Sequence, residues 1–272
     1  MSERPAAALS TPSILIYAQQ ERARAVARSL FPRRRNRVLL TRSAAAFEQA
    51  FRDALVDAAV VAVATGPAAG EESRRVTRLA SDFPSVPFFG LLSLRASDAG
   101  ALSQCVTHDF ADIIVEGVDD SVARDMVYRE SFTARFARAL HDPPSALCLC
   151  SPLQLMTWRY VIATAGRGVR TDSLAKLLRV TREHLSRTFA AEGGPNLKRV
   201  IDLVRLLAAA ELAKNPGYDV RDVAAVLGFA SPSHLSTTSQ RIVGTKPASL
   251  SRLRTVDLID RFSRGHGRSR QQ

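Results

Sequence analysis

Residues 219–244 read DVRDVAAVLGFASPSHLSTTSQRIVG, and this stretch predicts two short helices joined by a tight turn. The first helix has one apolar face with the spacing i, i+3, i+4, i+7, made by Val220, Val223, Ala224 and Leu227. Gly228 supplies the positive φ that ends many helices. Because Ser231-Pro232 has the pattern of a helix start, a second helix follows at once, with Leu235 facing inward. This arrangement is typical of a helix-turn-helix.

The same pattern occurs earlier, in residues 174–189, which read LAKLLRVTREHLSRTF. The predicted apolar face of its first helix consists of Leu174, Leu177 and Leu178. Its second helix contains His184-Leu185-Ser186, which repeats His234-Leu235-Ser236 at an offset of 50 residues, whereas the first helices repeat at an offset of 49. The two copies indicate a duplicated module whose later turn is one residue longer.

The residues between the two copies predict a single helix. Apolar residues keep helical spacing from Leu197 to Ala208, between Gly194-Pro195 and Asn215-Pro216. A helix of roughly 20 residues is about 30 Å long, at ~1.5 Å per residue. Successive major-groove faces of B-DNA lie about 34 Å apart. One chain is therefore predicted to place both second helices in consecutive grooves of double-stranded DNA.

Residues 152–255 resemble the DNA-binding domain of the AraC/XylS family of transcription regulators. The residues that carry the resemblance are Leu174-Ala175, Ser186-Arg187, Phe189, Arg205-Leu206, Ala209, Leu212, Gly228-Phe229, Ser231, Gly244 and Pro247. Three residues depart from the family pattern, since Ser239 and Leu235 replace aromatic residues and Arg179 replaces a turn glycine. We therefore expect the second unit to be loosely packed and to read bases weakly.

The first recognition helix is expected to bury Leu185 and Phe189, which leaves its other face for DNA. Arg187 can donate two hydrogen bonds to guanine O6 and N7, and Glu183 can accept one from cytosine N4. The resemblance points to the same base-reading residues, Glu183, Ser186 and Arg187, whereas Thr181 and Arg182 suit phosphate. The alternative for Arg187 is a surface salt bridge with Glu183 at i, i+4.

The second recognition helix offers mainly small polar side chains. The residues expected at DNA in this copy are Ser231, Ser233, Ser236, Thr237 and Lys246. Hydroxyl groups can contact phosphate, water or the thymine methyl group. This copy is therefore predicted to contribute less specificity than the first.

Basic residues are concentrated in the half that holds the duplicated module. Residues 141–272 contain 20 Arg and Lys against 10 Asp and Glu, whereas residues 1–140 contain 18 against 16. Such an uneven excess is typical of a polyanion-binding half, although a merely solvated basic surface is the alternative. No run reaches the 18 or so apolar residues of a membrane span, and we expect a cytoplasmic protein that does not bind membranes.

The N-terminal part alternates predicted strands and helices. Strands are expected at 13–17, 37–41, 58–64, 87–92 and 112–115. Helices are expected at 21–30, 44–55, 72–83 and near 97–107, with one long helix at 121–140. Short apolar strands that alternate with helices predict an α/β fold with a parallel five-stranded sheet covered on both faces. We expect the flavodoxin-like strand order 2-1-3-4-5, followed by an all-helical (all-α) domain with the two helix-turn-helix units.

This layout resembles the receiver domain of response regulators. The resemblance implies a phosphorylation site at the C-terminal edge of the sheet, with acidic residues for Mg²⁺, an acceptor Asp, a Ser or Thr and a Lys. The corresponding positions here are Ala18, Gln19, Ala62, Ser93 and Glu116, and residues 1–175 contain no lysine. Asp57 and Asp112 start strands and are expected at the opposite edge. The domain is therefore predicted to be a degenerate receiver (a pseudo-receiver) that is not phosphorylated by the usual route.

We expect five segments: a disordered lead at 1–11, the receiver-like domain at 12–140, a linker at 141–151, the DNA-binding domain at 152–255 and a basic tail at 256–272. A last helix is expected from Ala248 to about Arg261, with a disordered end beyond it. The cysteines are Cys105, Cys148 and Cys150, and their spacing does not fit a zinc site. No metal site, cofactor or catalytic residue is predicted.

The leading hypothesis is a sequence-specific transcription regulator, not an enzyme, whose receiver-like domain forms a homodimer or senses a signal. RNA polymerase is a further candidate partner. Two alternatives stay open. One is a response regulator controlled by phosphorylation, and the other is a protein-interaction adaptor with weakened DNA binding.

Overall fold

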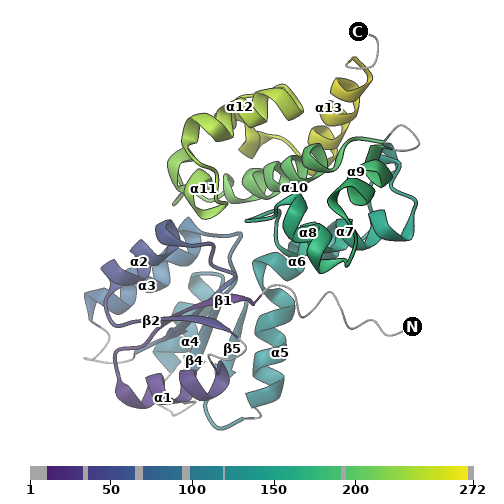
Figure 1. Cartoon of the computed structure of the whole chain (residues 1–272). Helices are drawn as coiled ribbons and strands as arrows, with labels where there is room; N and C mark the ends of the chain where they lie inside the picture. The colour runs from purple at the N-terminus through teal and green to yellow at the C-terminus, as the bar shows by residue number, and fades with distance from the viewer. Residues whose placement is uncertain are drawn as a thin grey trace. The chain divides into compact units, whose positions relative to one another are not determined.

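The computed structural model describes residues 11–32, 36–64, 70–93, 99–118, 120–190 and 194–268. The chain divides into two compact units (Figure 1). The sheet unit comprises Thr11–Arg135 together with Asn215–Tyr218, and the helical unit comprises Phe136–Lys214 and the described residues from Asp219 onward. Helix α6 (Phe132–Ala139) contains the point at which the chain passes from the first unit to the second.

The sheet unit contains five parallel strands in the order β2-β1-β3-β4-β5, as predicted. The strands are β1 Ser13–Tyr17, β2 Arg37–Thr41, β3 Ala58–Ala62, β4 Phe88–Leu92 and β5 Asp112–Val115. In the register of the sheet, Ile14 of β1 pairs with Val38 of β2 and with Ala58 of β3. Because every strand is parallel, the residues that follow the strands all lie at one edge of the sheet.

Helices cover both faces of this sheet. The helices are α1 Glu21–Leu30, α2 Ala44–Asp53, α3 Glu71–Asp82, α4 Ala99–Thr107 and α5 Asp120–Glu130. One face of the sheet buries Ile14, Ile16 and Val60 in a cluster with Leu30 of α1 and Val127 of α5. Successive strand residues point to opposite faces, so Leu15, Tyr17 and Val61 belong to the other face.

Aromatic rings fill the core on that other face. The ring centroid of Phe47, on α2, lies 6.0 Å from that of Tyr17 and 6.2 Å from that of Phe88. Phe51 stacks on Phe83 with the ring planes 7° apart and the centroids at 4.0 Å. Because each ring buries about 150–250 Å², these contacts account for much of the core on this side.

Helix α4 approaches the sheet closely at Gly90 of β4. A Cβ atom at Gly90 would lie 2.6 Å from Sγ of Cys105, so only glycine fits this position without displacing α4. Burial raises the pKa of the Cys105 thiol to about 11. Cys105 is therefore a neutral packing residue, because reactivity requires the thiolate.

The prediction of one long helix at 121–140 is wrong, because the segment forms two helices, α5 and α6. The break lies at Ser131, whose side-chain hydroxyl donates to the carbonyl oxygen of Tyr128 at 2.8 Å. The next backbone N–H, that of Phe132, donates to the carbonyl oxygen of Asp57 at 2.8 Å. Asp57 comes just before β3 and is far from α6 in sequence. Its carbonyl oxygen accepts from the first residue of α6, so a distant residue helps to set where this helix begins.

Asp57 is buried at the N-terminal edge of the sheet, as predicted. Its Oδ1 accepts hydrogen bonds from the backbone N–H and the hydroxyl of Thr133, at 3.2 and 2.6 Å. Its Oδ2 accepts from the backbone N–H of Ser13 at 2.8 Å. The Asp57 carboxylate therefore fastens the start of β1 and the first turn of α6 to β3.

The helical unit contains two helix-turn-helix pairs and their supports. Its α-helices are α7 Pro152–Ala163, α8 Thr171–Leu177, α9 Arg182–Ala190, α10 Leu197–Leu212, α11 Val220–Val226, α12 Pro232–Val243 and α13 Thr255–Arg268, and its 3-10 helices are η3 Ser145–Leu147 and η5 Pro247–Arg252. Figure 1 shows α10 between the α8–α9 pair and the α11–α12 pair. Helix α10 therefore joins the two pairs both in sequence and in space.

Helix α10 is unbroken but shorter than predicted. It has 16 residues, which corresponds to about 24 Å at ~1.5 Å per residue. Asn196 caps its start, because Oδ1 accepts from the backbone N–H of Arg199 at 2.9 Å. Its C-cap is Ala213, so the helix ends before the Asn215-Pro216 signal that defined the predicted end.

Four residues from the connection between α10 and α11 belong to the sheet unit. The Asn215 side chain accepts from the backbone N–H of Ser85 at 2.8 Å and donates to the Ser85 hydroxyl at 2.6 Å. The N–H of Gly217 donates to the carbonyl oxygen of Asp82 at 2.9 Å. A Cβ atom at Gly217 would lie 2.5 Å from the Phe83 ring, so glycine is required for this close approach.

The C-terminal part of the helical unit differs from the prediction. The expected helix from Ala248 to Arg261 is instead η5 followed by α13, and α13 extends to Arg268 through residues predicted to be a disordered basic tail. Leu258 and Phe262 of α13 are buried, and the Arg199 guanidinium lies 5.1 Å from the Phe262 ring centroid. These contacts with the body of the unit stabilise the helix. Residues 1–10, in the predicted lead, and 269–272 lie outside the described residues.

The segment 141–151, predicted to be a linker, contributes to the core of the helical unit. Leu147 and Leu149 are buried, and Trp158 of α7 donates from Nε1 to the carbonyl oxygen of Leu140 at 2.8 Å. Among the described residues, no helix is long and apolar enough to cross a bilayer. The same residues contain no group of three His, Cys, Asp or Glu side chains that could hold a metal ion.

Candidate nucleic-acid interface

The two helix-turn-helix pairs bury matching residues. Leu174 and Ala175 of α8 are buried, as are Val223 and Ala224 of α11, which follow 49 positions later. Leu185 of α9 and Leu235 of α12 are buried in the same way. Two residues predicted on the apolar faces, Leu177 and Val220, are 42% and 37% exposed because they are the last residue of α8 and the first of α11.

The two turns repeat the same backbone hydrogen bonds. In the first turn, N–H groups of Arg179 and Val180 donate to the carbonyl oxygens of Lys176 and Ala175, at 3.2 and 3.0 Å. In the second turn, the residues 49 positions later make the corresponding bonds at 3.0 and 2.9 Å: Gly228 to Ala225, and Phe229 to Ala224. The duplication inferred from the sequence is therefore present in the backbone.

Each recognition helix begins with the same type of cap. The Thr181 hydroxyl accepts from the N–H of His184 at 3.1 Å, and the Ser231 hydroxyl accepts from the N–H of His234 at 3.0 Å. The caps lie 50 residues apart because Ala230 lengthens the second turn by one residue. The N–H of Ala230 donates to Nδ1 of His234 at 3.3 Å, so this histidine supports the longer turn.

Arg179 occupies a left-handed backbone conformation. Its φ is 56°, and the matching residue of the second turn, Gly228, has a φ of 70°. A residue with a Cβ atom destabilises this conformation by about 1–2 kcal/mol relative to the right-handed region. The departure from the family's turn glycine therefore leaves the turn geometry intact and adds local strain.

The predicted DNA residues of the first motif lie together at the start of α9. Glu183, Ser186 and Arg187 are exposed, whereas Leu185 and Phe189 face the core. Arg182 is exposed and pairs with Asp172 at 3.4 Å. Within the described residues Glu183 and Arg187 form no ion pair, so the guanidinium of Arg187 is available to a ligand.

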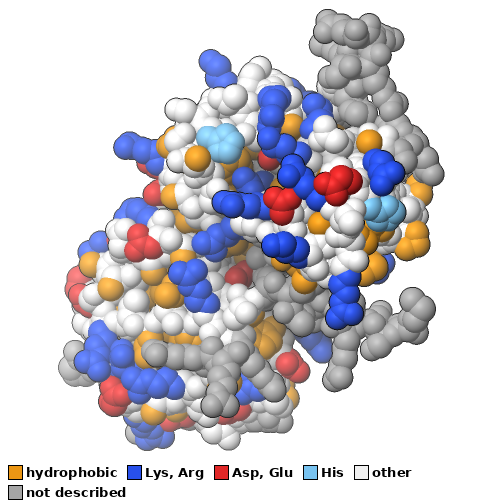
Figure 2. Space-filling model, in the orientation of Figure 1, with side chains coloured by type: hydrophobic (Ala, Val, Ile, Leu, Met, Phe, Trp, Pro, Cys, Tyr) orange, Lys and Arg blue, Asp and Glu red, His pale blue; other side chains and the backbone are white. Residues whose placement is uncertain are grey.

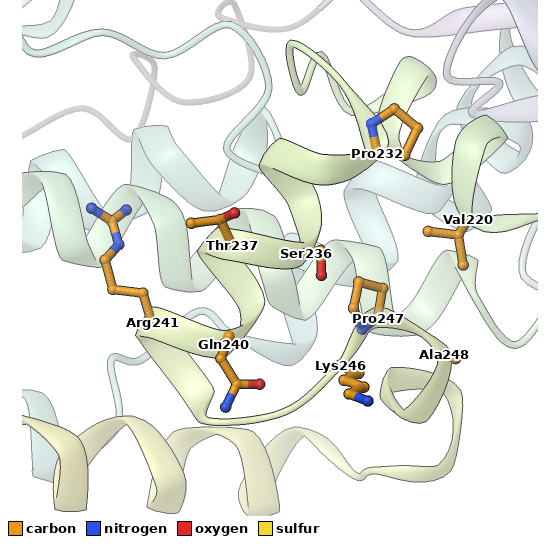
Figure 3. Close-up of a pocket in the computed structure, with 9 residues that line it drawn as sticks. All are labelled: Val220, Pro232, Ser236, Thr237, Gln240, Arg241, Lys246, Pro247 and Ala248. Atoms are coloured by element: carbon orange, nitrogen blue, oxygen red, sulfur yellow. The ribbon is translucent and has the colours of Figure 1, made fainter.

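The predicted DNA residues of the second motif lie along α12 and just beyond it. Figure 3 shows Ser236, Thr237 and Lys246 around a pocket at the outer surface of α12. Ser233 is exposed at the start of the helix, one turn before Thr237. The hydroxyl groups of the two caps, Thr181 and Ser231, accept from their own helices, and each keeps its O–H proton for another acceptor.

Two residues that the sequence analysis missed share this pocket. Gln240 and Arg241 line it with Ser236 and Thr237. Gln240 follows Ser236 by four residues, a helical spacing that marks it as a member of the same face. Nη2 of Arg241 also donates to Asp202 of α10 at 2.8 Å, a partner that no local sequence pattern identifies.

The second motif is well packed around Ser239, which corrects the expectation of loose packing. Ser239 is fully buried, and its hydroxyl donates to the carbonyl oxygen of Thr245 at 2.7 Å. Thr245 follows Gly244, which ends α12 with a φ of 65°. A small hydroxyl therefore replaces an aromatic ring here by satisfying a carbonyl group beyond the helix end.

Arg205 of α10 contacts the segment ahead of the first motif and the turn of the second. Its Nε and Nη2 atoms donate to the carbonyl oxygen of Gly166, ahead of α8, at 3.2 and 3.1 Å. Its guanidinium carbon lies 5.1 Å from the ring centroid of Phe229, in the second turn. Burial lowers the pKa of Arg205, and Asp202 opposes this shift.

The positions predicted for a degenerate phosphorylation site lie at one edge of the sheet. Ala18 follows β1, Ala62 ends β3, Ser93 follows β4 and Glu116 follows β5, with Gln19 next to Ala18. The Glu116 carboxylate accepts from Nε of Arg22 at 2.7 Å. This edge therefore has an acid paired with an arginine at the position where a receiver has lysine.

Residues 174–252 match a protein-family model described as a helix-turn-helix domain. This match covers α8 to η5, which are the two repeated motifs and the helix between them. The chain carries an AraC-type helix-turn-helix domain. The AraC-type domain makes the chain a DNA-binding transcription regulator. Its N-terminal sheet has the strand order of a receiver.

Solved structures similar to this chain include the following two. One is the signal receiver domain of an HD domain-containing protein from Pseudomonas fluorescens Pf-5, with 16% identity, a TM-score of 0.39, and coverage of 47% of this chain and 93% of that chain. The other is full-length FixJ from B. japonicum, with 15% identity, a TM-score of 0.38, and coverage of 85% of this chain and 97% of that chain. No curated protein matches the sequence.

Proposed function

We propose that this chain is a sequence-specific regulator that places α9 and α12 in successive major grooves of one DNA duplex. The observation that carries the proposal is the repeated pair of motifs joined by the unbroken helix α10. A recognition helix with a buried leucine and an exposed polar face is suited to insertion into a groove. The basic excess of the C-terminal half supports the same partner, because phosphates dominate DNA affinity.

The proposed reading residues differ between the motifs. In α9, Glu183, Ser186 and Arg187 read bases, and Arg182 contacts phosphate together with the exposed rim of Thr181. In α12, the base-facing residues are Ser233, Ser236, Thr237 and Gln240. Gln240 adds an adenine reader, since a carboxamide can bond N6 and N7 together. Lys246 and the exposed Ser231 are the proposed phosphate contacts of this motif.

Figure 2 supports the proposal that the DNA lies along the helical unit from one motif to the other. Lys and Arg side chains gather on the visible face of the helical unit, over α10 and between the two motifs. A mobility-shift titration over a salt series, on DNA selected from a random pool, tests the proposal. We expect log K to fall linearly with log salt. A binding constant that depends neither on the salt concentration nor on the DNA sequence would contradict the proposal.

We further propose that the sheet unit is not phosphorylated and serves dimerisation or sensing. Phosphoryl transfer requires Mg²⁺ held by carboxylates and a cation for the transferred group. The described sheet edge instead has Ala18 and Gln19 after β1, Ala62 at the end of β3 and the Glu116–Arg22 pair. These residues supply neither an acceptor carboxylate on β3 nor a free cation after β5.

Incubation with acetyl phosphate and Mg²⁺ is expected to leave the protein unmodified. The reason is the lack of an acceptor carboxylate at Ala62. Intact mass spectrometry measures the result, with a phosphorylatable receiver as the positive control. A mass increase of one phosphoryl group that maps to the sheet unit would refute this part of the proposal and favour a phosphorylation-controlled regulator.

A further inference from the structure

A groove of about 510 Å³ lies in the helical unit between the two motifs. Its walls are the segment ahead of α8, with Arg170 and Thr171, and helix α12, with Thr237 and Arg241. Helix α10 lines it with Lys198, Asp202 and Arg205. The groove adjoins the base-reading face of α12, since Thr237 and Arg241 line both it and the pocket shown in Figure 3.

Positive charge dominates this groove. Four cationic side chains line it, those of Arg170, Lys198, Arg205 and Arg241, against the single carboxylate of Asp202. Asp202 is neutralised by Arg241, since the two side chains are 2.8 Å apart. The groove as a whole is therefore suited to an anion.

Two of the four cations are available to a ligand. Arg205 is partly buried and bonds Gly166, and Arg241 bonds Asp202. Arg170 and Lys198 are exposed and form no ion pair within the described residues. They come from two different elements, Arg170 from the segment ahead of α8 and Lys198 from α10. Two free cations that face a common space can bind adjacent phosphate oxygens.

A second observation points to crowded positive charge. Burial lowers the pKa of Arg199, and the charge of Arg241 adds to this shift. The charge of Asp202 opposes this shift, and Arg199 lies next to the groove lining in sequence without lining the groove itself. The hydroxyl of Thr171 adds a neutral donor of the kind that commonly contacts phosphate, whereas that of Thr237 donates to the carbonyl oxygen of Ser233 at 3.0 Å.

We propose that this groove holds the sugar-phosphate backbone of the DNA between the two half-sites, with Arg170 and Lys198 as the direct phosphate contacts. The inference rests on the proposed function and adds a third contact to the two recognition helices. The phosphates that separate two successive major grooves pass between the two recognition helices, along α10, and α10 lines this groove together with α12 and the segment ahead of α8. Contacts of this kind fix register and orientation and carry no base information.

The test uses the full chain with R170Q and K198Q combined, on the duplex that the wild-type protein selects. We expect the slope of log K against log salt to become less negative by about 1.8, from about 0.9 for each lost phosphate contact. The selected sequence should not change. The control variant, R159Q with R264Q, removes the same charge from α7 and α13, away from the groove, and should shift the slope by much less.

Neutral methylphosphonates at the phosphates between the half-sites provide the second measurement. They should lower the DNA affinity of the wild-type protein and of the control variant several-fold. The affinity of the double variant should stay within about twofold, because this variant no longer makes the phosphate contacts that the modification removes. Equal weakening of all three proteins would overturn the inference and leave the proposed function standing. Absence of any selective binding by the wild-type protein would overturn both. Circular dichroism checks that each variant is folded.

Discussion

Replacing Arg187 by alanine is expected to weaken binding to the selected DNA by about 1–3 kcal/mol, or roughly 5- to 150-fold. Arg187 is exposed on α9 and makes no ion pair within the described residues, so its guanidinium is free to bond guanine O6 and N7. Its removal should also relax the base preference at one position of the site. Mobility-shift titration on the selected duplex and on duplexes with that base pair changed measures both effects.

Replacing Arg187 by lysine is the matched control. Lysine keeps the charge but lacks the planar pair of donors, so non-specific affinity should persist while the preference for guanine falls. Neither variant should lower the free energy of unfolding, since the side chain packs against nothing in the core. An unchanged base preference in the alanine variant would remove Arg187 from the reading residues.

Replacing Asp57 by alanine is expected to lower the free energy of unfolding of the sheet unit by about 3 kcal/mol. The substitution leaves the N–H groups of Ser13 and Thr133 and the Thr133 hydroxyl without their buried acceptor. Each buried donor left unsatisfied costs about 1–3 kcal/mol, and the protein can relax to reduce the sum. The melting temperature of this unit should fall by about 10 °C for a unit of this size.

Calorimetry of the full chain measures this change, because the two units can unfold separately. Replacing Asp53 by alanine is the control, since Asp53 is an exposed carboxylate at the end of α2 that, among the residues the structure describes, accepts only from the Gln49 side chain. That variant should stay within about 0.5 kcal/mol of the wild type. An Asp57 variant as stable as the Asp53 variant would show that the hydrogen bonds of the buried carboxylate do not stabilise the sheet unit.

Local patterns were sufficient to predict the strands and the two turns. Each strand is a short apolar run between polar or glycine-containing segments, and the order of strands and helices along the chain limits the sheet to few topologies. Gly228 and the caps Thr181 and Ser231 act within four residues of their own position. Interactions at such short range are visible in the sequence itself.

Interactions between distant residues were not predictable in this way. The break between α5 and α6 depends on Asp57, which lies 76 residues before Thr133. The pairing of Arg241 with Asp202 spans 39 residues, and so does the bond from Arg205 to Gly166. Helix α13 forms in a stretch of low helix propensity because Leu258 and Phe262 are buried. In each case a tertiary contact overrides or supplements the local signal.

The central claim is that two motifs fixed by one rigid helix bind successive turns of the same face of DNA. A series of duplexes in which base pairs are inserted between the halves of the selected site tests it most directly. Insertion of about five base pairs, half a helical turn, should reduce the affinity to that of a single half-site. Equal affinity at every spacing would contradict the claim.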